Sequence, residues 1–443
     1  MSRRNVLITV VSAAVSGLLL GLLSPGTSGA NPSVDGKRGS YIVVLRDDTP
    51  DPVSVGDDHA SRFGVERSMS YGAALRGYAA TIPLSKVGEL RADPRVAFVS
   101  EDRKVQATAK TPPAGTTAVQ TLPTGINRID ADLSSSVAGN GGGDVNVGVA
   151  VIDTGVGPHS DIDIKGGKNC NGSGSSYADG NGHGTHVAGT IGAKDDSVGV
   201  VGVAPGADIY AVRVLNNQGS GSWSNVICGV DWVTASASFI KVANMSLAGG
   251  GSDDGNCGNT NSDALHKAIC ASVTAGVTYV VAAGNENANF ASSVPAAYNE
   301  VLTVTATADF DGFAGGGAAA TCRTDVDDTV ADFSNYTTVG SADESHTIAA
   351  PGVCIYSTYM TRSGRKMVAT YATISGTSMA SPHVAGAAAL CVVGPCAVLT
   401  PAGVAEKLRG DAALQDQSYG FGGDPNSPSG GRYYGYLVEA DTY

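Results

Sequence analysis

Three polar residues that lie far apart in the chain are of the types needed for nucleophilic catalysis. Asp153 lies in the segment Val-Ile-Asp-Thr-Gly, His183 in Gly-His-Gly-Thr-His, and Ser378 in Gly-Thr-Ser-Met-Ala-Ser-Pro. A serine hydroxyl becomes a strong nucleophile when a histidine takes its proton and a third group orients that histidine. The three residue types therefore allow acyl transfer, provided that the fold brings them together.

Each of these residues also has a structural interpretation. A carboxylate at a strand end can cap the next turn, and a serine at a helix start is commonly an N-cap. His183 and His186 could form a metal pair, but the zinc peptidase motif His-Glu-x-x-His needs a glutamate, and Gly184 and Thr185 stand between these two histidines. A buried structural role for His186 is favoured. A metallohydrolase that uses Asp153 with both histidines stays open as an alternative, as does a non-catalytic binding scaffold.

Short apolar runs alternate with helix-like stretches from residue 145 onward. Such runs suit strands buried on both faces, so the sequence predicts an α/β fold with a doubly wound, mostly parallel sheet and helices on both faces. Functional groups gather beyond the carboxyl ends of such strands, and Asp153, Ser246 and Asn285 stand at the ends of three runs. The predicted strands cover 145–152, 209–215, 240–247, 277–283 and 301–305, with helices at 222–237, 262–275 and about 378–390.

The start of the chain has the pattern of an export signal. Arg3 and Arg4 precede an apolar stretch, and Pro25 and small residues near position 30 follow it. Residues 1–30 are therefore predicted to be a signal peptide, which makes the protein secreted and extracellular. The arginine pair leaves open a twin-arginine export route, and an uncleaved membrane anchor is the alternative interpretation.

Two further segments precede the alternating region. Residues 31–106 predict a small α+β domain, and residues 107–124 are a linker rich in Thr, Ala, Pro and Gly that suits a proteolytic cut. The remaining residues, 125–443, form the predicted catalytic domain. Within the small domain, the expected strands lie at 41–45, 73–82 and 95–99, and the expected helices at 53–63 and 84–92.

The composition excludes some function classes. The chain has 28 Lys and Arg against 41 Asp and Glu, a formal net charge of −13, which repels nucleic-acid phosphates. Hydrophobic residues make up 42%, enough for a large core. Eight cysteines in an exported chain predict four disulfides. Proximity along the chain favours Cys170–Cys228, Cys257–Cys270, Cys322–Cys354 and Cys391–Cys396, although eight cysteines permit 105 pairings.

The blocks around Asp153, His183 and Ser378, in this order, resemble the catalytic blocks of the subtilisin-like serine proteases, the subtilases. The resemblance runs from about residue 121 to about residue 409. The segment 31–106 resembles the propeptide of that family, a folding helper and inhibitor that is removed by self-cleavage. The resemblance implies a secreted preproprotein and a monomeric serine endopeptidase that needs no cofactor for its chemistry, binds no nucleic acid and leaves the membrane after signal removal.

The resemblance also implies a role for each residue. Ser378 attacks the scissile carbonyl, His183 is the general base and then the general acid, and Asp153 orients the imidazole. The segment Ala-Ala-Gly-Asn that ends at Asn285 resembles the oxyanion segment of the family. The side-chain amide of Asn285 and the backbone N–H of Ser378 would therefore stabilise the oxyanion.

Protein and peptide substrates are expected to bind between two chain edges that resemble the substrate-pairing segments of the family. Pairing with an extended peptide as an added strand ignores side chains, so it predicts broad specificity. A pocket wall of small residues without an acidic group predicts apolar or aromatic side chains before the cut bond. The expected substrate-binding residues are Gly219, Ser220, Gly221, Ser246, Leu247, Ala248, Gly249, Ala282, Ala283 and Gly284.

Structural calcium is an open expectation, because members of the family often bind it. Asp325, Asp327 and Asp328, in an insertion over 309–332, offer suitable oxygen donors, but their spacing is not that of an EF-hand loop. Thr347 stands where some relatives carry a metal-binding aspartate. No calcium site is assigned, and an acidic solvated loop is the favoured interpretation.

Overall fold

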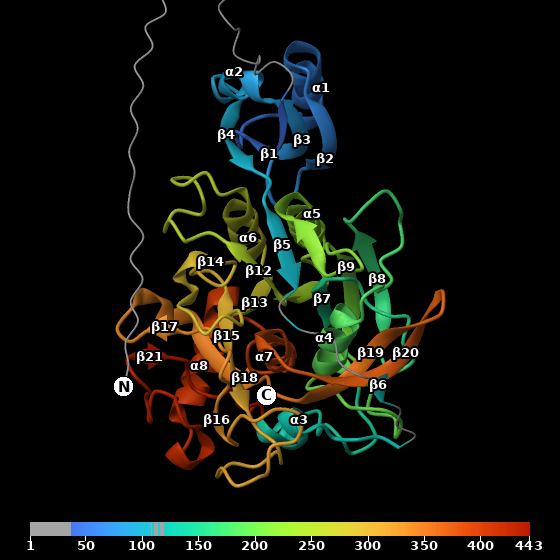
Figure 1. The fold of residues 1–443 in the computed structure, drawn as a ribbon, viewed down its shortest axis with the longest axis vertical. Helices are drawn as coiled ribbons and strands as arrows, with labels where there is room; N and C mark the ends of the chain where they lie inside the picture. Colours follow the sequence, from blue (N-terminus) through green and yellow to red (C-terminus); the bar gives the residue numbers. More distant parts are fainter. Residues whose placement is uncertain (1–36, 108, 110–113, 116–118) are drawn as a thin grey trace, which may run out of the picture.

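The computed structural model describes residues 37–107, 109, 114–115 and 119–443. The predicted signal peptide, residues 1–30, lies outside them. Figure 1 shows a small N-terminal domain (residues 38–101) at one end of a much larger domain, with one strand, β5 (Lys104–Ala107), running from the first into the second. Within the described ranges, none of the helices combines the length and the apolar character that crossing a bilayer requires.

The N-terminal domain is a four-stranded antiparallel sheet in the order β2-β3-β1-β4, with two helices packed on one face. The first helix starts where the Asp51 side chain accepts hydrogen bonds from the N–H groups of Val53 and Ser54, and it ends at Gly64, whose φ of 66° suits glycine. One strand, β2, was not predicted, and the strand expected from residue 73 begins only at Gly77. The elements are β1 (Arg38–Leu45), α1 (Pro52–Phe63), β2 (Glu66–Tyr71), β3 (Gly77–Pro83), α2 (Val87–Arg91) and β4 (Val96–Glu101).

The large domain is built on an eight-stranded sheet in the order β16-β15-β13-β11-β7-β9-β8, with β18 paired to β15. Every strand pair in it is parallel except that of β15 with β16. The predicted mostly parallel sheet is therefore confirmed. Its strands are β7 (Gly148–Asp153), β8 (Ile164–Asn169), β9 (Asp208–Arg213), β11 (Ile240–Met245), β13 (Thr278–Ala282), β15 (Leu302–Ala308), β16 (Thr329–Val330) and β18 (Thr347–Pro351).

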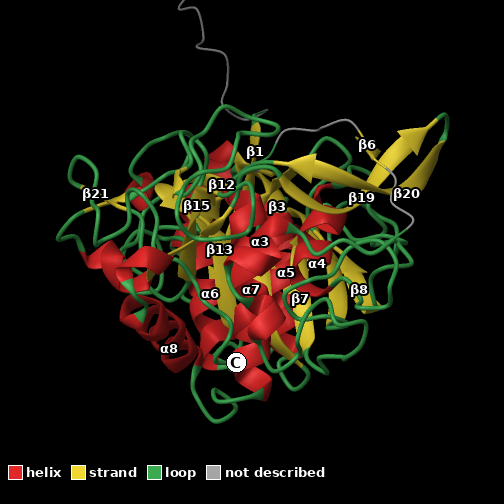
Figure 2. Cartoon of the chain, turned by 90° about the horizontal axis from the view of Figure 1, so that it is seen from below, coloured by secondary structure: helices red, strands yellow, loops and turns green. Residues whose placement is uncertain are grey.

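Helices cover both faces of this sheet (Figure 2), as the sequence predicted. The alternation along β7 shows it: Val149 and Val151 belong to the core beneath α4 and α7, whereas Ala150 and Ile152 belong to the core beneath α5 and α6. The described helices of this domain are α3 (Thr124–Arg128), α4 (His183–Gly192), α5 (Trp223–Ala235), α6 (Ala264–Thr274), α7 (Thr377–Val393) and α8 (Pro401–Leu414).

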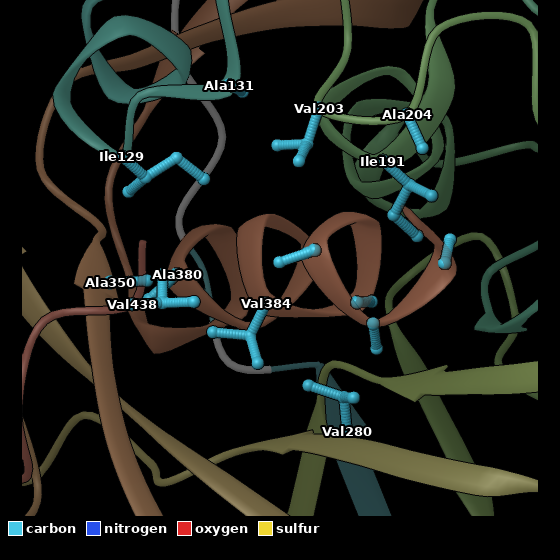
Figure 3. Close-up of a cluster of buried hydrophobic side chains, with 14 of the residues drawn as sticks. Ile129, Ala131, Ile191, Val203, Ala204, Val280, Ala350, Ala380, Val384 and Val438 are labelled. Atoms are coloured by element: carbon cyan, nitrogen blue, oxygen red, sulfur yellow. The ribbon is translucent and has the colours of Figure 1, made fainter. Parts of the chain in front are cut away.

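Helix α7 is the centre of the larger core. Fifteen consecutive residues, from Thr377 to Cys391, are buried, and Figure 3 shows Val384 of this helix near Val280 of the sheet while Ile191 of α4 lies on another side. A helix that is apolar all round and buried on every side has little freedom to shift. It is therefore a rigid mount for Ser378 in its first turn.

Three smaller sheets complete the fold of the described residues. The one that matters most has the order β10-β5-β12-β14 and joins the N-terminal segment to the large domain. A long hairpin, β19 with β20, was not predicted from the sequence, and it projects from the body (Figures 1 and 2). The strands are β5 (Lys104–Ala107), β6 (Ala114–Gly115), β10 (Ser220–Ser222), β12 (Leu247–Gly250), β14 (Ser293–Val294), β17 (Thr337–Thr338), β19 (Ile355–Ser363), β20 (Lys366–Ile374) and β21 (Arg432–Tyr433).

All eight cysteines are paired, and the four predicted disulfides are confirmed. The bridges close loops of 5 to 58 residues along the chain. They are Cys170–Cys228, Cys257–Cys270, Cys322–Cys354 and Cys391–Cys396.

Candidate active site

The three predicted catalytic residues lie at the ends of three different elements. Asp153 is the last residue of β7, His183 the first of α4 and Ser378 the second of α7. All three are buried. The Nδ1 atom of His183 lies 2.7 Å from Oδ1 of Asp153, and the same oxygen accepts a 2.7 Å hydrogen bond from the N–H of Thr154. The structure therefore brings the imidazole and the carboxylate into direct contact.

The approach of α4 to β7 depends on a glycine. A Cβ atom on Gly184 would lie 2.2 Å from the carbonyl oxygen of Gly155 and 3.2 Å from Oδ1 of Asp153. Any side chain at this position would push the helix away from the strand and separate His183 from Asp153. The run of small residues around His183 thus has a direct physical purpose.

The environment of His183 favours its protonated form. Burial alone would lower the pKa of His183. The nearby Asp153 carboxylate raises this pKa through its charge and its hydrogen bond, and the charge of Asp179 raises it further, so that together they outweigh burial. The net result is a pKa above the ordinary value for histidine. The other ring nitrogen, Nε2, has no hydrogen-bond partner among the described residues, so it is the atom available to accept a proton.

Ser378 is held by a buried polar network that the sequence analysis did not predict. Its hydroxyl donates to the carbonyl oxygen of Ser246 at 3.3 Å, and the Ser246 hydroxyl donates to the carbonyl of Ser378 at 2.9 Å. Asn244 links the two sides, because its amide donates to Ser246 and its oxygen accepts from Ser381 at 2.6 Å. The network ties the start of α7 to the end of β11.

Asn285 is tied to the same helix start. Its side-chain oxygen accepts from both the N–H (2.8 Å) and the hydroxyl (3.0 Å) of Thr377, and the Thr377 hydroxyl also accepts from the N–H of Gly284. With the amide oxygen occupied, the NH₂ group of Asn285 is the end that faces away from Thr377. The residue before the serine thus orients the amide expected to stabilise an oxyanion, a role that the sequence analysis did not assign.

The two predicted substrate edges lie on either side of β5. Ser220 and Gly221 of β10 pair with Gln106 and Val105, and the N–H of Ala107 donates to the carbonyl of Gly219 at 2.8 Å. On the other side, β12 pairs antiparallel with β5: Leu247 lies opposite Ala107, and Ala248 opposite Gln106. The end of the N-terminal segment therefore lies as an added strand between β10 and β12, in what is called the groove below. Gly249 pairs with β14, and Ser246 contacts Ser378.

A pocket of about 680 Å³ opens beside β5. Asn285 and Glu286 are among its lining residues, so this pocket carries one acidic group. The Glu286 carboxylate already accepts from the N–H of Asn285 and the amide of Asn335, both through Oε2. The predicted wall residues Ala282, Ala283 and Gly284 are buried and are not among the lining residues.

His186, the second histidine of α4, has the buried structural role that its sequence context favoured. Nε2 of His186 lies 3.0 Å from the carbonyl oxygen of Ile355 and 3.1 Å from that of Ala372, which anchors the β19–β20 hairpin. Burial lowers the pKa of His186 to about 3, so it stays neutral. In the described part of the chain, the groups of side chains close enough to hold a metal include neither His183 nor His186.

The acidic residues of the insertion do not converge as one set. Asp325 pairs with Arg323, and Asp328 pairs with Arg128 at 2.9 Å. Asp327 instead lies with Asp309 and Asp311. Because Arg128 also lies 3.4 Å from Asp309, a protein cation already neutralises part of this cluster, and no calcium site is assigned. Thr347 is buried and donates to the carbonyl of Asp343 at 2.6 Å.

Two family models match the chain. A model described as "Subtilase family" matches residues 144–422, and one described as "Peptidase inhibitor I9" matches residues 40–108. The first therefore covers the residues of the candidate site, and the second covers the N-terminal domain and β5.

Named relatives and a solved structure are also similar. The chain is 39% identical over 304 residues to an alkaline protease of Alkalihalobacillus alcalophilus, a match that spans 69% of this chain and 66% of that protein. It is 37% identical to subtilisin DY of Bacillus licheniformis, over 68% of this chain and 96% of the relative. Subtilisin E of Bacillus subtilis (strain 168) is 36% identical, over 81% and 80%. A crystal structure of a cold adapted subtilisin-like serine proteinase shares 32% identity, with a TM-score of 0.51 and coverage of 72% of this chain and 97% of that chain.

Proposed function

Because this chain belongs to the subtilase family of serine peptidases, as predicted from the sequence, we propose that it is a secreted endopeptidase that cuts proteins through an acyl-enzyme on Ser378. The observation that carries this proposal is the buried 2.7 Å hydrogen bond between His183 and Asp153. It stands at the carboxyl end of a parallel strand, where α/β folds place their chemistry.

In the proposed reaction, the hydroxyl of Ser378 turns from the Ser246 carbonyl toward Nε2 of His183. The histidine takes the hydroxyl proton while the serine oxygen attacks the scissile carbonyl, and it then gives a proton to the leaving amine. Asp153 holds Nδ1–H of the ring, so that Nε2 is the basic nitrogen, and it stabilises the imidazolium. Water then attacks the acyl group while His183 takes its proton. The histidine gives this proton to the Ser378 oxygen, and the acid product leaves.

The oxyanion of the tetrahedral intermediate is proposed to lie between the amide of Asn285 and the backbone N–H of Ser378. Two arguments support this place. The amide oxygen of Asn285 is occupied by Thr377, and Ser378 belongs to the first turn of α7, where the N–H groups and the positive end of the helix dipole point out of the helix start. Donors that are fixed before the reaction stabilise the developing charge without reorganisation.

Substrates are proposed to bind as β5 does, as a strand between β10 and β12. This pairing uses main-chain groups, which supports broad specificity. An apolar or aromatic preference before the cut bond remains our proposal. Both observed contacts of Glu286 engage Oε2, so its carboxylate is partly satisfied by the protein itself.

The chain is proposed to be a preproprotein. Residues 1–30 would direct export, residues 31–106 would form the inhibitory propeptide, and self-cleavage would occur within 107–124 to release a monomeric peptidase, residues 125–443. The inhibitor family match and the position of β5 in the groove support this order. Within the proposed linker, Ala107 ends β5 and Thr124 begins α3.

A serine-directed phosphonylating reagent tests the proposal. We expect loss of peptidase activity, one adduct mapped by mass spectrometry to Ser378, and a mature N-terminus within 107–124. The Ser378→Ala variant is the control and should take up no reagent. A binding scaffold would show neither activity nor adduct. A metallohydrolase would keep its activity after labelling and lose it in a chelator, and either result would refute the assignment.

A further inference from the structure

One buried carboxylate near the proposed triad has no part in the mechanism so far. Asp179, in the loop before α4, is only 2% exposed. Its Oδ1 atom accepts hydrogen bonds from the hydroxyl of Thr154 (2.9 Å) and from the N–H groups of Asn181 and Gly182 (both 2.8 Å). Its Oδ2 atom accepts from both the N–H (3.0 Å) and the hydroxyl (2.7 Å) of Thr185.

These five hydrogen bonds join the two elements that carry Asp153 and His183. Thr154 follows Asp153 directly and donates its N–H to that carboxylate, and its hydroxyl both donates to Asp179 and accepts from the N–H of Gly184 at 3.0 Å. The bonds from residues 181, 182 and 185 fix the first turn of α4, which begins at His183. The Asp153–His183 hydrogen bond is therefore one side of a closed ring that runs from Asp153 through Thr154 and Asp179 to the start of α4.

We infer that Asp179 is a positioning residue for the reaction: it sets the distance and angle between His183 and Asp153 and adds a second negative charge near the imidazole. The inference rests on the proposed function, because it concerns the same histidine. Asp179 does not touch the substrate in this role and acts only through the pair that it holds.

The charge argument follows from what faces His183. From β7 it faces Asp153, and from the loop before α4 it faces Asp179, whose charge favours the protonated ring. His186, one turn along α4, is neutral at working pH. An imidazolium forms as Ser378 attacks, so a carboxylate that favours this cation also favours the transition state.

Asp179→Asn is the first test, because it keeps the size of the side chain and removes its charge and one acceptor. We expect kcat to fall about 10- to 100-fold, with KM within about twofold, since only the geometry of the reacting groups is disturbed. We also expect the acid limb of kcat/KM to move to lower pH, because the loss of the negative charge lowers the pKa of His183.

Asp424→Asn is the matched control. Asp424 is also 2% exposed and accepts backbone hydrogen bonds, from Asn426 and Ser427, but it lies in the C-terminal loop. We expect this variant to lose stability without a change in kcat or in the acid limb. If Asp179→Asn behaves in the same way, with only a lower melting temperature, the inference is wrong.

A second pair of variants separates the hydrogen-bond ring from the charge. Thr154→Val removes the hydroxyl that joins Asp179 to β7 and keeps every charge, whereas Thr154→Ser retains the hydroxyl. We expect kcat to fall for valine and to return close to the wild-type value for serine. Equal kcat values for the two variants would contradict the positioning role.

The last test does not need an active enzyme. In the full chain with Ser378→Ala, NMR titration of the His183 ring, with and without Asp179→Asn, should show a lower pKa in the double variant. An unchanged pKa overturns the inference. Failure of the proposed function itself would look different, because the wild-type chain would then show no hydrolysis and no labelling of Ser378.

Discussion

The N-terminal domain contacts the large domain in two regions that differ in kind. In the groove, β5 pairs with β10 and β12 through main-chain groups. At the helix surface, the open face of the N-terminal sheet packs against α5 and α6, and Ile42, Val44 and Ala79 share one buried cluster with residues of those helices. The first contact can be imitated by any extended peptide, but the second requires the folded domain.

Carboxylates make the helix contact more specific. Asp231 of α5 accepts from three consecutive N–H groups, those of Gly72, Ala73 and Ala74, at 2.7 to 3.1 Å. In the other direction, Asp102 accepts from the N–H and the hydroxyl of Ser224 in the first turn of α5. If substrates bind in place of β5, as proposed, they should displace β5 alone, and the N-terminal domain should stay attached through its contact with α5.

The largest expected effect comes from Ser378→Ala. This variant should leave both contacts in place, and the two domains should stay covalently linked because self-cleavage is lost. Without the hydroxyl no acyl-enzyme can form, so hydrolysis of peptides should fall by about 10⁶-fold, the figure for loss of the serine in subtilisin. Electrophoresis should show the full chain uncut within 107–124, with an unchanged circular dichroism spectrum. Self-cleavage at the normal rate would remove Ser378 from the mechanism.

Asn285→Ala should lower kcat by about 10²- to 10³-fold, the range known for one oxyanion donor in subtilisin, and should leave KM nearly unchanged. Both contact regions should stay in place, because β5 pairs with β10 and β12 through main-chain groups. Steady-state kinetics with a peptide substrate provide the measurement. A rise in KM at constant kcat would instead assign Asn285 to substrate binding.

Asp231→Ala should weaken only the helix contact. Loss of the hydrogen bonds to the Gly72–Ala74 backbone should cost about 2 kcal/mol, or on the order of 30-fold in the affinity for the cleaved domain. The cleaved N-terminal domain should then leave the large domain sooner, so the lag before full peptidase activity should shorten. Gel filtration should recover less of the complex between the two domains. Asp208→Asn is the control, since Asp208 pairs with Lys165 within the large domain. An equal effect of both variants would show that the helix contact contributes little.

The smallest effect concerns pH and leaves the maximal rate unchanged. The pKa of His183 is raised above its ordinary value, and only the neutral ring can accept the serine proton. Activity should therefore be lost as the pH falls through this raised pKa, so the acid limb of kcat/KM should lie above the position of an unperturbed histidine. A limb below that position would contradict the balance of burial and charge described for this ring.

Much of this architecture is local enough to be predicted from sequence. The run ending at Asp153 is apolar, short and followed by Thr-Gly, so both its strand and its position at a rim can be predicted. The cysteine pairs could be predicted because partners lie near each other along the chain. In contrast, Asp179 and Asn244 were not identified as site residues, because the contacts that connect them to the site, with Thr154 and with Ser381, join residues 25 and 137 positions apart in the chain.

The missed strands have a similar cause. The sequence of β2, Glu66–Tyr71, begins with three polar residues and has no regular alternation of polar and apolar side chains, and only Tyr71 is buried. The hairpin of β19 and β20 is buried at its inner end and exposed at its tip, and the inner end is held by His186 of α4. Such elements are specified by tertiary contacts more than by local pattern.

Thr377 gives the nucleophile and the oxyanion donor a shared support. Its hydroxyl and N–H both hold the oxygen of Asn285, and the next residue in the chain is Ser378. When thermal motion displaces the first turn of α7, the attacking oxygen and the amide should therefore travel together. The distance between these two groups should fluctuate less than the distance from either group to the bound peptide. The site is therefore more precise in how its own groups are spaced than in where they stand against the substrate.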